Sequence, residues 1–184
     1  MASLSQGVPA TVTASPKPGY ACKYWNTLGA RGVFMDVAPV YIKPGSNPSS
    51  ANNSHVGVAF FCNLVPSTSP DDKPWKGVAS GVIFYGNGAI HLENWLGGSN
   101  NAYVSPSPIG YWSPGIVYRV TALLNADNSV TLAVYSTNSA GAVTALVASA
   151  TGAAAPGNHA AVIATQGDDA QGGSVGCCPN ALYF

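Results

Sequence analysis

The sequence contains very little charge. Only 8% of its 184 residues are charged, and seven Lys or Arg residues balance seven Asp or Glu residues. A chain without a net positive field has no long-range means of attracting the phosphates of nucleic acid or an anionic membrane surface. We therefore expect no nucleic-acid partner.

Long apolar runs are missing as well. No stretch approaches the roughly 18 uninterrupted apolar residues that suggest a membrane-spanning helix, so we expect no membrane insertion. The opening MASLSQGVPATVTASPKPGY has neither the basic start nor the apolar run of a secretory signal peptide. Gly, Ser, Asn and Thr keep the surface polar without charge, which favours an extracellular or virion-surface location.

Cysteine is scarce, and its spacing matches no common metal motif. None of the four cysteines, Cys22, Cys62, Cys177 and Cys178, has a partner at Cys-x-x-Cys spacing. We expect no metal and no other cofactor. In an extended backbone the adjacent Cys177 and Cys178 point in opposite directions, so one of them could form a disulfide with Cys22 or Cys62. The alternative is that most or all four are free buried thiols.

Strand patterns are abundant, and convincing helical periodicity is absent. Three segments rich in β-branched and aromatic residues, 115–125, 129–139 and 142–152, are separated by turn-forming residues and predict a three-stranded meander. Further strands are expected within 31–43, 55–65, 77–88, 89–96, 159–167 and 180–184. About ten strands in one chain predict an all-β fold, a two-sheet antiparallel β-sandwich.

The strands predict one domain over residues 1–184. Residues 1–20 are expected to form an irregular N-terminal arm. Segments 42–55 and 65–77 are rich in Pro, Ser and Asn, which favours exposed loops.

The segment GYWSPGIVYRVTALLNADNSVTLAVYS at 110–136 has a Trp just before a strand, a YRV opening, an acidic turn and then VTLAVYS. With the strand that follows, it resembles the back-sheet meander of concanavalin A-like jelly-roll domains, the lectin and glucanase superfamily. The late glycine-rich passage and NALYF are similar to the way those domains end, so the resemblance covers residues 56–184. It implies a curved sheet whose concave face carries a binding or catalytic groove.

Many legume-type members of that superfamily bind calcium, but the matching positions here are poor in ligands. Neither NADN at 125–128 nor GDD at 167–169 offers the six to eight oxygen ligands that calcium takes. A hairpin turn adequately explains the first of these segments.

Segment 89–96, AIHLENWL, is the expected counterpart of the strand that carries the catalytic acids in glucanases. Alternation along a strand puts His91, Glu93 and Trp95 on one face. Glu93 is the only glutamate, whereas glycoside hydrolysis by the usual route needs two carboxylates. A second acid would have to come from Asp36 or from the pair at 168–169. A glycoside hydrolase that uses Glu93 is therefore the least favoured function, and we expect a protein that is not an enzyme.

Carbohydrate binding demands less of the sequence. Sugar sites combine an aromatic ring with planar polar groups that hydrogen-bond hydroxyls in fixed directions. The residues expected to bind carbohydrate are His91, Glu93, Trp95, Asn100, Asn101, Tyr103 and Trp112. The alternative for Trp95 and Trp112 is a place in the core, because tryptophan is highly buried on average.

We therefore expect a non-catalytic, lectin-like carbohydrate-recognition or adhesion module whose partner is a glycan or a cell-surface carbohydrate. The alternative is a structural or receptor-binding surface protein of a virus or phage that assembles as a homo-oligomer through jelly-roll packing. The Ala-rich segment 141–157 would supply a weakly polar surface for such packing.

Overall fold

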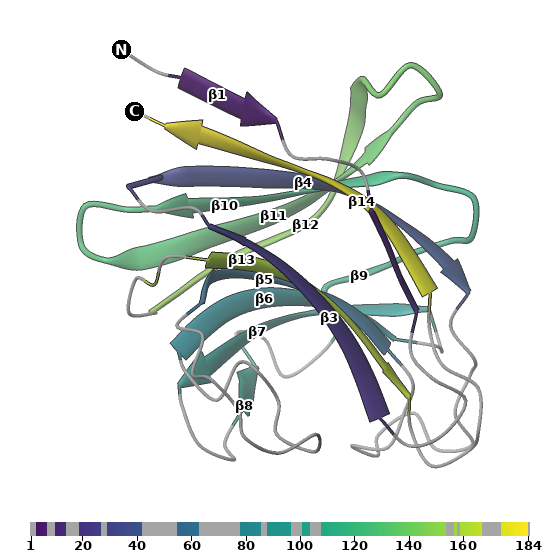
Figure 1. The fold of residues 1–184 in the computed structure, drawn as a ribbon, viewed down its shortest axis with the longest axis horizontal. Helices are drawn as coiled ribbons and strands as arrows, with labels where there is room; N and C mark the ends of the chain where they lie inside the picture. Colours follow the sequence, from purple (N-terminus) through teal and green to yellow (C-terminus); the bar gives the residue numbers. More distant parts are fainter. Residues whose placement is uncertain are drawn as a thin grey trace.

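A computed structural model shows the chain as two packed antiparallel sheets (Figure 1). It describes residues 3–6, 10–13, 19–26, 29–41, 55–62, 78–85, 88–96, 101–103, 108–153, 157, 159–166 and 174–183. The described residues form no helix, and so none that is long and apolar enough to cross a membrane. The expected all-β, two-sheet sandwich is confirmed.

The first sheet, sheet A, has seven strands. Their order is β1 (Ser3–Gln6), β14 (Ser174–Tyr183), β4 (Gly32–Tyr41), β10 (Tyr118–Leu124), β11 (Ser129–Thr137) and β12 (Val143–Ala153), with β2 (Ala10–Thr13) also paired to β14. Strands β1 and β14 lie side by side near the two chain ends (Figure 1). Within residues 1–20, where an irregular arm is expected, residues 3–6, 10–13 and 19–20 are strands, and the first two of these segments pair with β14.

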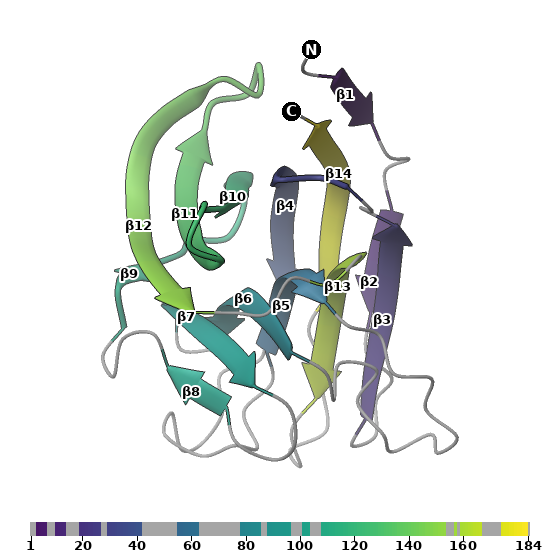
Figure 2. The same cartoon turned by 90° about the vertical axis from the view of Figure 1, so that its left-hand side faces the viewer.

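The second sheet, sheet B, also has seven strands. Their order is β3 (Gly19–Asn26), β13 (His159–Gln166), β5 (His55–Cys62), β6 (Val78–Tyr85), β7 (Ala89–Leu96) and β8 (Asn101–Tyr103), with β9 (Gly110–Tyr111) also paired to β7. The end of β12 approaches β7, so the sheets meet along this side of the sandwich (Figure 2). The loops expected within 42–55 and 65–77 lie outside the described residues, apart from the start of β5.

The meander expected over residues 115–152 is confirmed as β10, β11 and β12, which pair in sequence order. Its first turn is the NADN segment. Asn125 N donates to Ser129 O at 2.8 Å, and Asp127 Oδ1 accepts from Ser129 N at 3.0 Å. Asn128 takes a positive φ of 65°, which asparagine tolerates better than most residues. The turn interpretation of this segment therefore holds.

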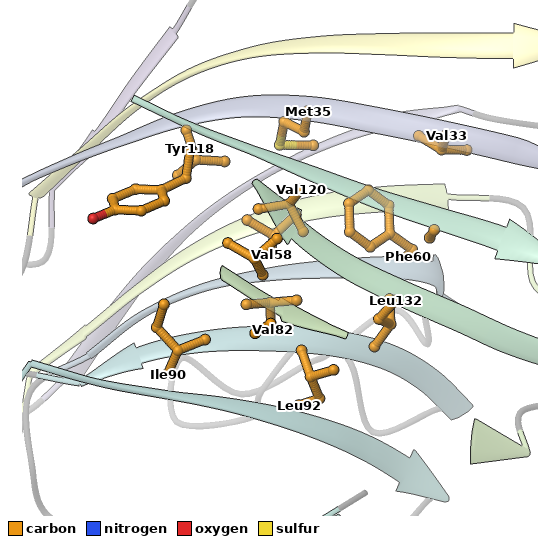
Figure 3. Packing of buried hydrophobic residues seen from close by; sticks show 14 of the residues in the cluster. Val33, Met35, Val58, Phe60, Val82, Ile90, Leu92, Tyr118, Val120 and Leu132 are labelled. Carbon is orange, nitrogen blue, oxygen red and sulfur yellow. The ribbon is translucent and has the colours of Figure 1, made fainter. Parts of the chain in front are cut away.

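The core lies between the two sheets. Figure 3 shows Met35 of β4 and Val120 of β10 above Val58, Val82 and Ile90 of sheet B. All five are fully buried. Burying one such side chain stabilises the fold by about 1.5–3 kcal/mol, so alternate positions of β4, β6, β7 and β10 are constrained to be apolar.

Candidate functional site

Strands β6 and β7 each present one face to the core and one face away from sheet A. In β7, Ile90 and Leu92 belong to the buried core, so the intervening His91 points to the opposite side, as does Glu93. The expected alternation of this strand is confirmed for residues 90–93. In β6, Val82 and Phe84 face the core by the same criterion, which directs Ile83 and Tyr85 outward. We call this side the outer face of sheet B.

Glu93 is almost inaccessible although it lies on the outer face. Its exposed fraction is 3%, and the hydroxyl of Tyr85 donates to its Oε1 at 2.9 Å. The position opposite Glu93 on β6 is Gly81, which has no side chain to compete for this space. Burial of a carboxylate is costly unless hydrogen bonds compensate, so the Tyr85 hydroxyl contributes directly to holding this acid in place.

Tyr85 reaches Glu93 by passing His91. Ile83 pairs with His91, so Tyr85 is two residues beyond the His91 register position, on the side away from Glu93. The rings of Tyr85 and His91 meet edge to face, with centroids 5.3 Å apart and planes at 85°. These three side chains therefore form one group in contact, which we call the Tyr85–His91–Glu93 cluster. Alternation along the strands indicates that they share a face, but it does not indicate that they touch.

His91 is half-buried. Burial lowers its pKa, because desolvation penalises the charged imidazolium more than the neutral ring. At neutral pH the imidazole is therefore uncharged, with one ring nitrogen able to donate a hydrogen bond and the other able to accept one. The cluster thus combines an acid, a neutral imidazole and a phenol.

Small residues lie next to the cluster. Gly57 of β5 pairs with Ile83, and a Cβ at Gly57 would lie 2.6 Å from Ile83 Cδ1. The absence of that Cβ lets Ile83 lean over β5. Ile83 therefore covers Gly57 on the outer face, whereas Gly81 leaves room for the side chain of Glu93.

Trp112 lies in the core. Its exposed fraction is 8%, its Nε1 donates to Tyr85 O at 2.8 Å, and its backbone N donates to Gly88 O at 2.9 Å. This position agrees with the core interpretation of Trp112 and not with a ring that stacks on a ligand. Trp112 supports the site indirectly, because its indole holds the end of β6 that carries Tyr85.

The remaining expected binding residues are located only by their backbone. Strand β8 pairs with β7, so that Tyr103 is opposite Glu93 and Asn101 is opposite Trp95. Asn100 lies outside the described residues. Sequence reasoning missed Tyr85, although the alternation of GVIFYG around the apolar Val82 and Phe84 could have placed it beside Ile83 on the outer face.

A second carboxylate does not reach Glu93 from Asp36. Asp36 belongs to sheet A, where Arg119 Nε and an Nη donate to its two oxygens at 2.7 and 2.8 Å. The Arg119 guanidinium also lies 4.9 Å from the centre of the Phe34 ring. Asp36 is therefore part of an ion pair on the other sheet, and the acids at 168–169 lie outside the described residues.

The described residues hold no group of three or more His, Cys, Asp or Glu side chains arranged for a metal. The cysteines divide between the sheets, with Cys22 on β3 and Cys62 on β5 in sheet B, and Cys177 and Cys178 on β14 in sheet A. Their pairing stays a prediction.

Comparison with known proteins gives similarity at the level of structure only. No protein-family model matches the sequence, and no curated protein does. The VIP36 exoplasmic/lumenal domain in its Ca2+/Man-bound form has a TM-score of 0.58 at 10% identity, covering 98% of this chain and 81% of that one. The legume lectin-like domain from Entamoeba histolytica has a TM-score of 0.55 at 10% identity, covering 99% and 89%.

Two further structures are similar. A protein of unknown function from Shewanella oneidensis MR-1 has a TM-score of 0.56 at 12% identity, covering 98% of this chain and 75% of that one. Scytalido-glutamic peptidase has a TM-score of 0.42 at 11% identity, covering 79% of this chain and 63% of that one. Together with the two sheets described above, the similarities show that the chain has the concanavalin-like β-sandwich fold of legume lectin-like domains.

Proposed function

We propose that the chain is a non-catalytic, lectin-like carbohydrate-recognition or adhesion module that binds a glycan on the outer face of sheet B. The observation that carries the proposal is the hydrogen bond from Tyr85 to the buried Glu93, beside the neutral ring of His91. Sugar hydroxyls are recognised by polar groups held in fixed directions. Glu93 is 3% exposed, so in this proposal it acts mainly through its neighbours: because it fixes the Tyr85 hydroxyl beside His91, a ligand would not bear the full entropic cost of ordering that side chain.

The fold supports the same function. The structure of the VIP36 domain is of a Ca2+/Man-bound form, and that domain shares this architecture over 98% of the chain. A glycan-binding module of this kind would act at an extracellular or virion surface, where cell-surface carbohydrate is its partner. The proposed contact residues are His91, Glu93, Trp95, Asn100, Asn101 and Tyr103.

The test is a glycan array on the purified chain, followed by calorimetry with the best ligand for wild type and Glu93→Gln. The amide keeps the acceptor oxygen for Tyr85 but loses the charge, so affinity should fall about tenfold, equivalent to ~1.4 kcal/mol. Asp127→Asn is the matched control, because Asp127 also accepts hydrogen bonds through one oxygen but lies exposed in the β10–β11 turn of sheet A. Its affinity should equal that of wild type.

Reducing-sugar release, measured on the same proteins, separates binding from catalysis. A binding module releases none in wild type or in Glu93→Gln. If wild type hydrolyses the glycan and Glu93→Gln loses that activity by orders of magnitude while binding survives, Glu93 is a catalytic acid and the proposal is wrong. Absence of any array signal would also contradict it.

Assembly into a homo-oligomer is a second candidate, and strand β12 favours it. This strand, VTALVASATGA, is last in the order of sheet A and contains no charged residue. Its exposed side chains include Val143 and Leu146, with exposed fractions of 47% and 59%. Charges commonly protect a strand at a sheet edge from pairing with another chain, and β12 has none. Light scattering should give a closed oligomer without glycan binding if the chain is a shell component of a virus or phage.

A further inference from the structure

The outer face of sheet A, the side that points away from sheet B, carries exposed aliphatic side chains. Sheet B packs against only one side of sheet A (Figure 1). In β10, Val120 and Ala122 belong to the core, so Leu123 points outward. Val117 directly precedes Tyr118, another core residue, and points outward in the same way. The exposed fractions of Leu123 and Val117 are 43% and 38%.

Strand β12 adds two more aliphatic side chains to this face. Leu146 is opposite Tyr135, which alternates with the core residue Val134, so Leu146 points outward with an exposed fraction of 59%. Val143 is opposite Thr137, which follows Tyr135 on the same side of β11, and is 47% exposed. Four of the five exposed large hydrophobic side chains in the described residues therefore lie on the outer face of sheet A.

Polar groups on the same face are already hydrogen-bonded within the protein. Arg119 donates to both oxygens of Asp36, at 2.7 and 2.8 Å. The hydroxyls of Thr131 and Thr151 are 2.8 Å apart. A polar group that keeps its protein partner costs little to cover, because little hydrogen bonding to water is lost. Another surface can therefore cover this face at a low desolvation cost.

Sheet A is large enough to form a stable interface. Six strands follow one another in its order, and five of them have between seven and eleven residues. With strands about 4.8 Å apart and a rise of about 3.3 Å per residue, the outer face measures about 29 by 30 Å, roughly 850 Å². A stable protein–protein interface typically buries about 800 Å² on each partner, so contact over this whole face reaches that size.

We propose that the outer face of sheet A binds a second copy of this chain, face to face across a two-fold axis. Charge favours this partner. Asp36 and Arg119 are the only charged residues in the seven strands of sheet A as the structure describes them, and they neutralise each other. A two-fold contact brings a patch against itself, so an unpaired charge would meet its like. A neutral face avoids that repulsion and offers a charged partner nothing to recognise.

The contact is made by side chains of the face and not by backbone pairing at the edge strand β12. Two bulges interrupt the pairing of β12 with β11, because Thr144 and Val147 are extra residues without a partner in the register. Bulges twist an edge strand and oppose its pairing with another chain. Face-to-face packing leaves the outer faces of the two copies of sheet B pointing in opposite directions. This inference does not depend on the proposed glycan binding.

Sedimentation equilibrium over about 1–100 μM tests the proposal with wild type, Leu146→Glu and Leu123→Glu. Wild type should be a dimer. Each variant brings two unpaired carboxylates into a two-fold contact, so its dissociation constant should rise about a hundredfold or more. Leu123 is on β10, two strands away from the edge strand β12, so its variant distinguishes packing of the face from pairing of the edge.

Tyr111→Glu is the control, because it places the same charge at the fifth exposed large hydrophobic side chain, which is 70% exposed. Its neighbour Gly110 is opposite the core residue Ile90, so Tyr111 points to the outer face of sheet B. This variant should remain a dimer, and circular dichroism should show the same β-rich spectrum for every variant. Leu146→Ser and Leu123→Ser replace any glutamate variant whose spectrum changes.

Three results would overturn the proposal. The first is a wild type that stays monomeric at the highest concentration, including one that instead sediments with phosphatidylcholine vesicles. The second is a dimer that Leu146→Glu dissociates and Leu123→Glu does not, since that contact lies at the edge of β12. The third is a dimer that neither leucine variant weakens or that Tyr111→Glu dissociates, since that contact lies on another surface.

Discussion

Tyr85→Phe removes one oxygen atom and tests whether the Tyr85–His91–Glu93 cluster is organised as described. The phenylalanine ring keeps the edge-to-face contact with His91, but the donor 2.9 Å from Glu93 Oε1 is lost. A hydrogen bond to a charged group contributes about 1.5–3 kcal/mol to stability. Glu93 is 3% exposed, so water can replace little of the lost bond. We therefore expect Tyr85→Phe to lower the free energy of unfolding by an amount within that range.

Thermal unfolding at pH 7, followed by circular dichroism, measures this effect. For a chain of this size each kcal/mol shifts Tm by about 2–4 °C, so Tyr85→Phe should lower Tm by about 3–12 °C. Tyr135→Phe is the matched control, because it removes the same atom from a half-exposed tyrosine on β11 in sheet A. Its Tm should stay within about 1 °C of wild type, as surface changes usually do.

A double-mutant cycle with Glu93→Gln isolates the bond. In the Glu93→Gln background the acceptor is neutral, and removal of the Tyr85 hydroxyl should then cost only about 0.5–1.5 kcal/mol, the value for a hydrogen bond between neutral groups. If Tyr85→Phe costs the same in both backgrounds, or leaves Tm unchanged in wild type, the charge-assisted bond does not organise the site and the reasoning is refuted.

Two further predictions concern the same face. Burial holds the pKa of His91 in the folded protein below its unfolded value of 6.5. As the pH falls, the unfolded chain therefore takes up a proton at this residue before the folded protein does. The free energy of unfolding is thus highest above pH 6.5 and decreases as the pH falls from 6.5 to the folded pKa. Urea midpoints at pH 7.5 and pH 5.5 should differ less in His91→Asn than in wild type, and equal differences would contradict the burial effect. Gly57→Ala should destabilise the fold by about 1–3 kcal/mol through its clash with Ile83. Ile83→Val removes the clashing Cδ1, so the double variant should lose less stability than the sum of the losses in the two single variants. Additive urea midpoints would show that Ile83 moves aside freely.

Local sequence patterns were sufficient to predict those features of the structure that depend only on residues close together in the sequence. The outward direction of His91 and Glu93 follows from the period-two alternation of AIHLENWL against Ile90 and Leu92, which had to be buried. The β10–β12 meander follows from short turns, since Asn125 and Asp127 close the first one through hydrogen bonds within five residues. The two-sheet class of the fold required no more than the number and length of such segments.

Tertiary structure decided which distant segments pair, and with that the composition of the candidate site. Strands β1 and β2 pair with β14 at the opposite end of the sequence, and four-residue segments such as SLSQ and ATVT carry too little local signal to indicate this. The sequence left Asp36 as a candidate second carboxylate for Glu93. The structure places Asp36 on β4 in sheet A, where it pairs with Arg119. Backbone pairing between remote strands depends on the burial of the whole core, which no short window of sequence contains.

The adjacent residues Tyr111 and Trp112 show the division most clearly. Sequence alone determined that, in an extended segment, the two rings point to opposite sides, because alternation is a local property of the backbone. The pairing of β9 with β7 decides which ring is buried. Its register places Gly110 against Val147 and Trp112 against the end of β6, and it leaves Tyr111 exposed on the outer face of sheet B. A one-residue shift of that register would exchange the two rings, since pairing register fixes the face of every side chain.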